Sequence, residues 1–181
     1  SIQKEFPVDA NRTFLVGSGK GFAAVETTAA SFPQTFAGLI GLGEVAANDL
    51  GSYENFRNLP TLFPRECDGT TAIKGKIDEL GYANCTISAA GAEGEPKVEG
   101  APAQTWEWIG KNVRSAYPLQ LTFAPKSDFA RAANWISLSG IQVSEGPKLE
   151  AKADSAENTI TIDADKVANM VVYLNDELVD M

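Results

Sequence analysis

The amino-terminal part of the chain alternates short apolar runs with segments of helical spacing. Apolar runs at residues 13–16 and 36–43 are typical of buried strands, and two further short strands are predicted at 60–64 and 84–88. The polar stretch from 44 to 58 predicts a loop with one helical turn. Strands that alternate with helices predict a mostly parallel sheet with right-handed crossovers and helices on both sides.

Three helices are predicted in this part of the chain. The first covers residues 20–31 and is stopped by Pro33, and the second covers 70–80, with Gly81 as its cap. The third covers 103–114 and places Trp106, Ile109 and Val113 on one face. On this helix we expect Trp106 to lie in the core and Trp108 to be partly exposed.

After Tyr117-Pro118 the pattern changes to an alternation of apolar and polar residues. This period of two predicts strands of an antiparallel sheet, at residues 119–123, 133–138, 148–151, 159–162 and 170–174. The charged faces are then the solvated side of one sheet. The sequence therefore predicts an α/β domain over residues 1–116 and a small β-rich domain over 117–181.

The first predicted strand runs into a glycine-rich turn before the first helix. The turn consists of Gly17, Ser18, Gly19, Lys20 and Gly21. Glycines permit a sharp turn between strand and helix. This turn between strand and helix is the candidate functional site of the chain.

Composition and charge narrow the classes of function. The 181 residues are 44% hydrophobic and 22% charged, which is typical of a soluble globular protein. The net charge of −9 opposes binding to nucleic acid or to anionic lipid. No apolar stretch reaches the roughly 20 residues of a membrane-spanning helix, and we identify no cofactor or metal motif. The compartment stays open, export included, because the chain begins with Ser1.

Two cysteines, Cys67 and Cys85, are too few for a disulfide scaffold. They are either two semi-buried thiols or a single bridge, and the first interpretation is favoured.

The order of several short motifs resembles the α/β-hydrolases of the esterase and peptidase type. The approach to the turn at residues 8–17, the run at 32–40 and the run at 55–63 resemble three successive strands of that fold, and the remainder is similar to a β-rich extension found after some hydrolase domains. The resemblance covers residues 7–181. It implies a partial α/β-hydrolase fold that begins at the fifth strand of the family's sheet.

The catalytic residues that this family uses are missing from the chain. The family carries its nucleophile at the centre of a Gly-x-Ser-x-Gly turn, and that position here is Gly19, while the chain contains no histidine to act as the base. Asp68 lies near the position of the family's acid. The loop in which the histidine would fall offers only Glu93, Glu95 and Glu99 as ionisable acids.

The turn has two other possible roles. Ser18 and Lys20 could form a serine–lysine dyad, but a solvated lysine is favoured. The amides after Gly19 could bind a carboxylate or phosphate without chemistry, but a turn that packs the helix on the strand is favoured. For Asp68, capping of the helix that starts near Thr70 is favoured over a vestigial catalytic role.

The resemblance also implies that the first strand has lost its neighbour. In the full fold this strand is central, whereas here it would be an edge without charge or proline, and such edges pair with other chains. We therefore expect residues 13–16 to pair with another copy or with a separate polypeptide.

Three functions follow as hypotheses. The first is a non-catalytic, hydrolase-like subunit of a protein assembly. The second is an esterase or peptidase completed by a partner chain. The third is a carbohydrate-binding or adhesion module built on the β-rich domain, for which the sequence offers only alternation and Trp135.

Overall fold

The structure is a computed structural model that describes residues 7–88 and 103–181. Its first part is a four-stranded sheet in the order β1-β2-β3-β4, with every neighbouring pair parallel. The strands are β1 Phe14–Ser18, β2 Gly38–Leu42, β3 Thr61–Phe63 and β4 Cys85–Ile87. The prediction of a parallel sheet is confirmed, and β1 lies at its edge.

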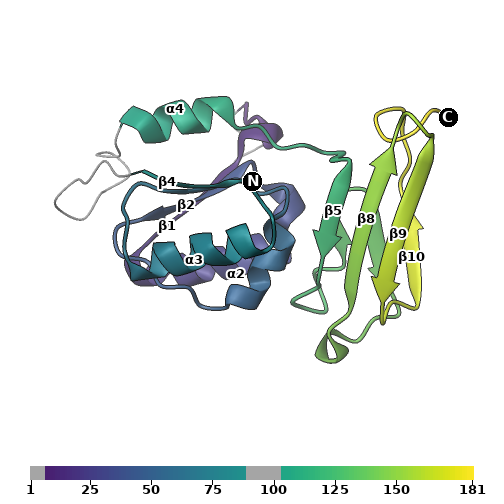
Figure 1. Ribbon diagram of the computed structural model, residues 1–181, viewed down its shortest axis with the longest axis horizontal. Coiled ribbons are helices and arrows are strands. Elements are labelled where there is room, and N and C mark those ends of the chain that lie inside the picture. The colour runs from purple at the N-terminus through teal and green to yellow at the C-terminus, as the bar shows by residue number, and fades with distance from the viewer. Residues whose placement is uncertain (1–6, 89–102) are drawn as a thin grey trace.

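Helices cover both faces of this sheet, as predicted (Figure 1). Helices α2 (Phe22–Ser31) and α3 (Asp68–Glu79) pack on one face, around a core that includes Phe22, Phe63 and Ile73. Helix α4 (Ala103–Lys111) covers the other face, where its side chains meet Ile40, Leu42 and Leu62. All five residues of β2 are buried, because this strand is covered from both sides.

The orientation predicted for α4 is wrong for two residues, since Trp106 is 53% exposed and Val113 is 51% exposed. Ile109 packs against the sheet as predicted. Trp108, which is partly exposed as predicted, packs there as well. The Trp108 ring lies 5.9 Å from the ring of Phe14 and occupies the space that a side chain at Gly38 would need, since an added Cβ there would come within 2.5 Å of the indole. Because Gly38 has no side chain, it leaves the space that Trp108 fills.

Short 3-10 helices join these elements. They are η1 Ala10–Arg12, η2 Gly19–Gly21, η3 Pro33–Thr35, η4 Leu50–Phe56 and, in the second part of the chain, η6 Val143–Glu145. The longest, η4, occupies the segment in which a loop with one helical turn is predicted. Four of its residues are buried, so this connection belongs to the core.

The second part of the chain consists of two antiparallel sheets of three strands, in the orders β5-β8-β9 and β10-β7-β6. The strands are β5 Gln120–Phe123, β6 Ala132–Ala133, β7 Ile136–Ser139, β8 Lys148–Asp154, β9 Thr159–Asp165 and β10 Asn169–Val172. Antiparallel pairing is confirmed, but the single sheet predicted for this part is wrong. Both sheets contribute to one core around Trp135, Phe123 and Leu149.

The two parts meet where η4 contacts β5. Asn55, which is 2% exposed, donates from Nδ2 to the carbonyl oxygens of Ala30 and Ala124, both at 2.8 Å. Its Oδ1 accepts from the Ala124 amide at 2.6 Å. One amide side chain therefore ties α2, η4 and the end of β5 together.

Within residues 7–88 and 103–181, none of the helices is both long and apolar enough to cross a lipid bilayer.

Candidate functional site

The predicted turn joins β1 to α2 through η2. The backbone at Gly19 has φ +49°, in the left-handed region that favours glycine. Its carbonyl accepts the amide of Phe22, the first residue of α2. The sharpest point of the turn is therefore the residue that stands at the centre of the Gly-x-Ser-x-Gly pattern.

The two glycines that flank Ser18 and Lys20, Gly17 and Gly21, differ in how closely other atoms approach them. A Cβ added at Gly17 would collide with Val25 Cγ2 and come within 2.8 Å of Phe22 Cα, so this glycine lets α2 pack directly on β1. Gly21 has φ −70°, and nothing lies within 4 Å of an added Cβ. The turn thus requires glycine at 17 and 19 but not at 21.

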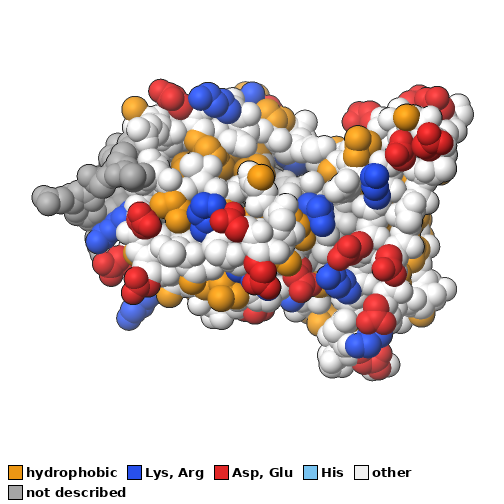
Figure 2. Space-filling view, viewed as in Figure 1, with side chains coloured by type: hydrophobic (Ala, Val, Ile, Leu, Met, Phe, Trp, Pro, Cys, Tyr) orange, Lys and Arg blue, Asp and Glu red, His pale blue; other side chains and the backbone are white. Residues whose placement is uncertain are grey.

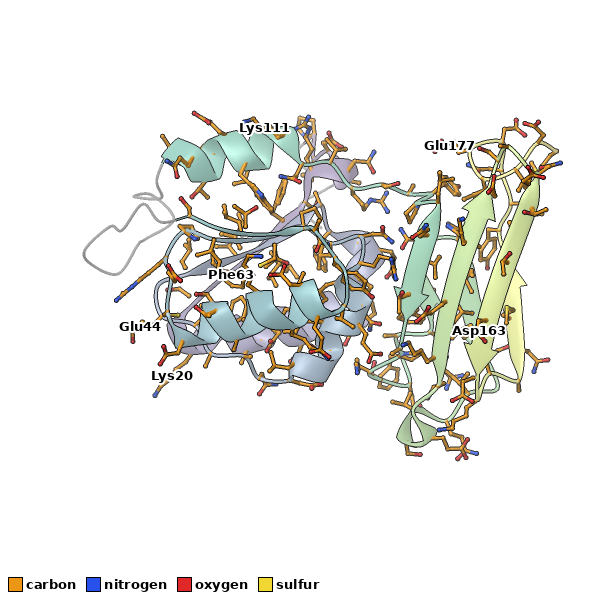
Figure 3. The ribbon with its side chains drawn as sticks, viewed as in Figure 1. Lys20, Glu44, Phe63, Lys111, Asp163 and Glu177 are labelled. Atoms are coloured by element: carbon orange, nitrogen blue, oxygen red, sulfur yellow. The ribbon has the colours of Figure 1, made fainter. Side chains whose placement is uncertain are left out.

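A cavity of about 470 Å³ opens beside the turn. Its lining residues come from the turn, from the start of α2 and from the segment after β2: Gly19, Lys20, Ala23, Glu44, Val45 and Ala46. Lys20 and Glu44 lie at the same end of the parallel sheet (Figure 3), and Glu44 forms an ion pair of 3.3 Å with Arg65. The cavity has room for a ligand, but its lining contains no serine, threonine or cysteine.

The serine–lysine alternative finds no support in the geometry. Ser18 and Lys20 are both exposed, and no hydrogen bond joins their side chains in the described structure.

Asp68 is not the cap of α3, so that prediction is wrong. The helix begins at Asp68 itself and its N-cap is Cys67, whose amide donates to Thr70 Oγ1 at 2.8 Å while the Thr70 hydroxyl donates back to the Cys67 carbonyl at 2.9 Å. Asp68 is exposed in the first turn, where a carboxylate interacts favourably with the helix dipole. It does not line the cavity beside Gly19.

Both cysteines are free thiols, so the favoured interpretation is confirmed. Burial raises the pKa of the Cys85 thiol to about 11. Burial also opposes ionisation of Cys67, but hydrogen bonds at Thr70, Val45 and Gly69 outweigh it, and the net pKa of Cys67 is lowered.

The loop in which the family's histidine would fall, with Glu93, Glu95 and Glu99, lies outside the described residues. Among the residues that are described, no group of three His, Cys, Asp or Glu side chains is placed to hold a metal ion.

Sequence reasoning missed a buried carboxyl beneath the turn. Glu26 of α2 is 1% exposed, and its Oε2 accepts the amide of Asn48 at 2.8 Å. Glu26 Oε1 and the Tyr53 hydroxyl each lack a hydrogen-bond partner in the described part of the chain. Burial raises the pKa of Glu26, although the neighbouring Tyr53 hydroxyl and the Asn48 amide oppose the shift. The only signal in the sequence is that Glu26 shares the apolar face of α2 with Phe22, Ala29 and Ala30.

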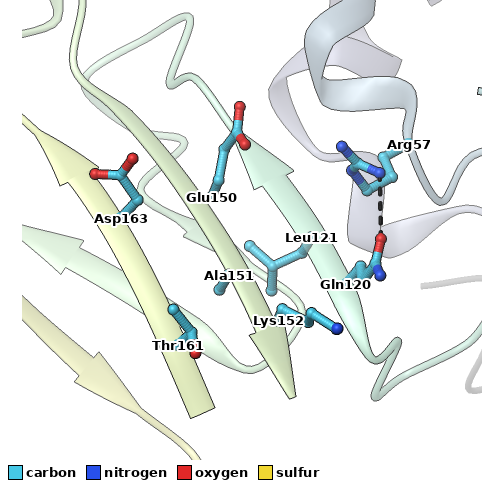
Figure 4. Close-up of a pocket in the computed structure, with 8 residues that line it drawn as sticks. All are labelled: Arg57, Gln120, Leu121, Glu150, Ala151, Lys152, Thr161 and Asp163. Carbon is cyan, nitrogen blue, oxygen red and sulfur yellow. Dashed lines mark hydrogen bonds between the residues drawn. The ribbon is translucent and has the colours of Figure 1, made fainter. Parts of the chain in front are cut away.

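A second cavity, of about 280 Å³, lies where η4 meets the outer face of the β5-β8-β9 sheet (Figure 4). Arg57 donates to Thr122 Oγ1 at 2.9 Å and to Gln120 Oε1 at 3.4 Å, and its guanidinium carbon lies 4.6 Å from the centroid of the Tyr82 ring. The remaining charged residues of the lining are Glu150, Lys152 and Asp163. Arg57 contacts Thr122 and Gln120 in one part of the chain and Tyr82 in the other, so it joins the two parts. The residues that line this cavity include no nucleophile paired with a base.

Trp135 is fully buried, and its Nε1 donates to the Pro118 carbonyl at 2.8 Å. It cannot stack on a sugar, which removes the aromatic residue on which the carbohydrate-binding hypothesis depends.

Comparisons with protein-family models, with curated proteins and with solved structures find no match for this chain.

Proposed function

We propose that the chain is a non-catalytic, α/β-hydrolase-like subunit that joins a protein assembly through the free edge of β1. The observation that carries the proposal is Gly19. The turn joins a parallel strand to a helix, as the family's nucleophile turn does, but Gly19 at its centre has no side chain and the chain contains no histidine.

The position of β1 supports the second half of the proposal. The Thr13 carbonyl accepts the Ala37 amide at 2.7 Å, so the backbone groups of alternate residues face β2. The amides and carbonyls of Phe14 and Val16 then face away from it, and no strand in the described residues pairs with them. This edge carries no charge or proline, the usual protections against pairing.

Hydrolytic activity tests the first half of the proposal. The purified chain, given a fluorogenic ester, should produce no turnover above the rate in buffer. Turnover that follows the chain through purification would contradict the proposal.

Co-purification with natural partners tests the second half. Val16→Lys places a charge on the free edge and should abolish co-purification, because a lysine on an edge strand opposes pairing with another strand. The matched control is Leu50→Lys, since Val16 and Leu50 are each 38% exposed. Equal retention of partners by the two variants would contradict a role for β1.

A hydrolase completed by a partner chain is the second candidate. The cavity of about 470 Å³ beside Gly19 favours it, because a partner that pairs with β1 would bring its own side chains close to that cavity. Ester turnover by the assembly, absent from the chain alone and lost with Val16→Lys, would favour this candidate over the first.

A further inference from the structure

The far end of the β-rich part has an apolar cleft between its two sheets. Strand β9 is the last strand of one sheet and β10 is the first strand of the other, so both edges are free in the described structure. Between them lies a cavity of about 330 Å³, lined by Asn158, Ile160, Ile162, Val172, Leu174 and Val179. Five of these six side chains are aliphatic, so the cleft exposes apolar surface that the two sheets do not cover.

The two edges differ in how they are protected. Strand β9 carries Asp163 and Asp165, charges that discourage pairing. Residues 169–174 form the edge on the other side, and they include no charge, proline or glycine. Val171 is 51% exposed, Tyr173 is 56% exposed and Leu174 is 49% exposed. Pairing is therefore favoured along β10.

The backbone of β10 offers hydrogen bonds in the correct direction. The Tyr173 amide donates to the Trp135 carbonyl at 2.8 Å, so in this antiparallel register Val171 faces Ser137 of β7 as a bonded pair. The amides and carbonyls of Met170 and Val172 then face the free edge. An added strand would bond to them and place alternate side chains in the cleft.

Charge indicates the kind of segment that would fit. Residues 148–181 contain three lysines against eight Asp and Glu, and Figure 2 shows acidic side chains gathered over this end of the molecule. Asp163 and Glu177 lie on it (Figure 3). A second copy of the chain would bring two acidic surfaces together, whereas a basic segment would be attracted.

We propose that this cleft binds an extended segment of a partner protein, which adds as a strand to β10, inserts alternate apolar side chains between β9 and β10, and carries lysine or arginine at its ends. This recognition mode combines main-chain hydrogen bonds with pockets for alternate side chains. The surface lies at the opposite end of the chain from β1, so this inference is independent of the function proposed above.

A synthetic peptide tests the proposal on the full chain. The probe has about ten residues, the length of a long strand, with alternating valine and threonine and a lysine at each end. Saturating peptide should slow hydrogen exchange at the amides of Met170 and Val172 about tenfold or more, while Val171 and Tyr173, already bonded to β7, change little. The same peptide with glutamate ends should bind about tenfold more weakly at low salt, and added salt should reduce the difference.

Two variants localise the binding. Leu174→Glu places a carboxylate in the cleft and should lower the affinity about tenfold, whereas Tyr173→Glu adds the same charge outside the cleft and should change it less than about twofold. Both side chains are about half exposed, so both variants should fold. The proposal is overturned by absence of protection at millimolar peptide, by equal weakening in the two variants, or by protection of Met170 and Val172 in a self-associated chain without peptide.

Discussion

Gly19 is the residue on which the interpretation of the turn depends. With φ +49° it occupies a conformation that costs other residues about 1–2 kcal/mol. Gly19→Ala should therefore lower the free energy of unfolding by about 1 kcal/mol, measured by urea denaturation. Gly21→Ala is the control, because φ −70° and open space accept a methyl group, and it should be neutral or stabilise by up to about 1 kcal/mol. Equal effects at the two positions would contradict this geometry.

Glu26 should make the stability depend on pH. Its pKa in the folded chain is raised above the ordinary value of 4.5, so the folded state holds the proton more tightly than the unfolded state. The stability that this carboxyl contributes is present below pH 4.5 and is lost as the pH rises through the folded pKa.

Glu26→Gln tests this dependence. It keeps the acceptor for the Asn48 amide and removes the charge, so the free energy of unfolding should fall less steeply above pH 4.5 than in the unmodified chain. Urea denaturation between pH 4.5 and 7 measures the difference. Parallel pH profiles for the two proteins would show that Glu26 does not titrate as described.

Residue-scale features were predictable where one residue type alone explains the geometry. The glycines at 17–21 predict a tight turn, and the structure has one, with Gly19 at φ +49°. The cap of α3 was not predictable in this way, because aspartate is a better N-cap than cysteine by intrinsic preference. Thr70 reaches back to Cys67 and moves the start of the helix to Asp68.

At the scale of elements, all four parallel strands were predicted. Apolar runs mark the central strands β2 and β3, whose residues are all buried, since such runs occur where both faces of a strand are covered. The face of α4 could not be predicted from periodicity. Helical spacing groups Trp106 with Ile109 and Val113, whereas the residues three and four positions from Trp108 are polar. The space above Gly38, which Trp108 fills, is not visible in the sequence.

The orientation of α4 can be tested with its two tryptophans. Trp108→Ala should lower the free energy of unfolding by about 2 kcal/mol, less than for a fully buried tryptophan, because the ring packs on Phe14 and Gly38. Trp106→Ala removes a ring that is 53% exposed, so this variant should change the free energy of unfolding by about 0.5 kcal/mol or less. A larger loss of stability for Trp106→Ala than for Trp108→Ala would place Trp106 in the core, as the sequence pattern alone predicts.

On the scale of the whole molecule, Asn55 joins the two parts of the chain. Its hydrogen bonds reach Ala30 and Ala124, which lie 25 and 69 residues away in the sequence. No local pattern reveals partners at such distances, so the role of η4 was not predictable. The hydrophobic clusters on either side of this junction are built from separate stretches of sequence.

Asn55→Ala should uncouple these clusters. It leaves the Ala124 amide and two carbonyl groups without partners in a buried place, at a cost of about 3 kcal/mol or more. Thermal unfolding should then separate into two transitions. Asn58→Ala, which removes one exposed hydrogen bond to the Gln120 carbonyl, should keep a single transition. One transition for both variants would argue against Asn55 as the link.

We propose above that a turn without a nucleophile belongs to a subunit that binds through β1. Hydrogen exchange at the amides of Phe14 and Val16, compared between the purified chain and the chain with its natural partners, tests it most directly. Both amides should exchange rapidly in the chain alone and about a hundredfold more slowly in the assembly, because a partner strand then accepts their hydrogen bonds. Slow exchange in the isolated chain, or exchange that partners leave unchanged, would contradict the claim.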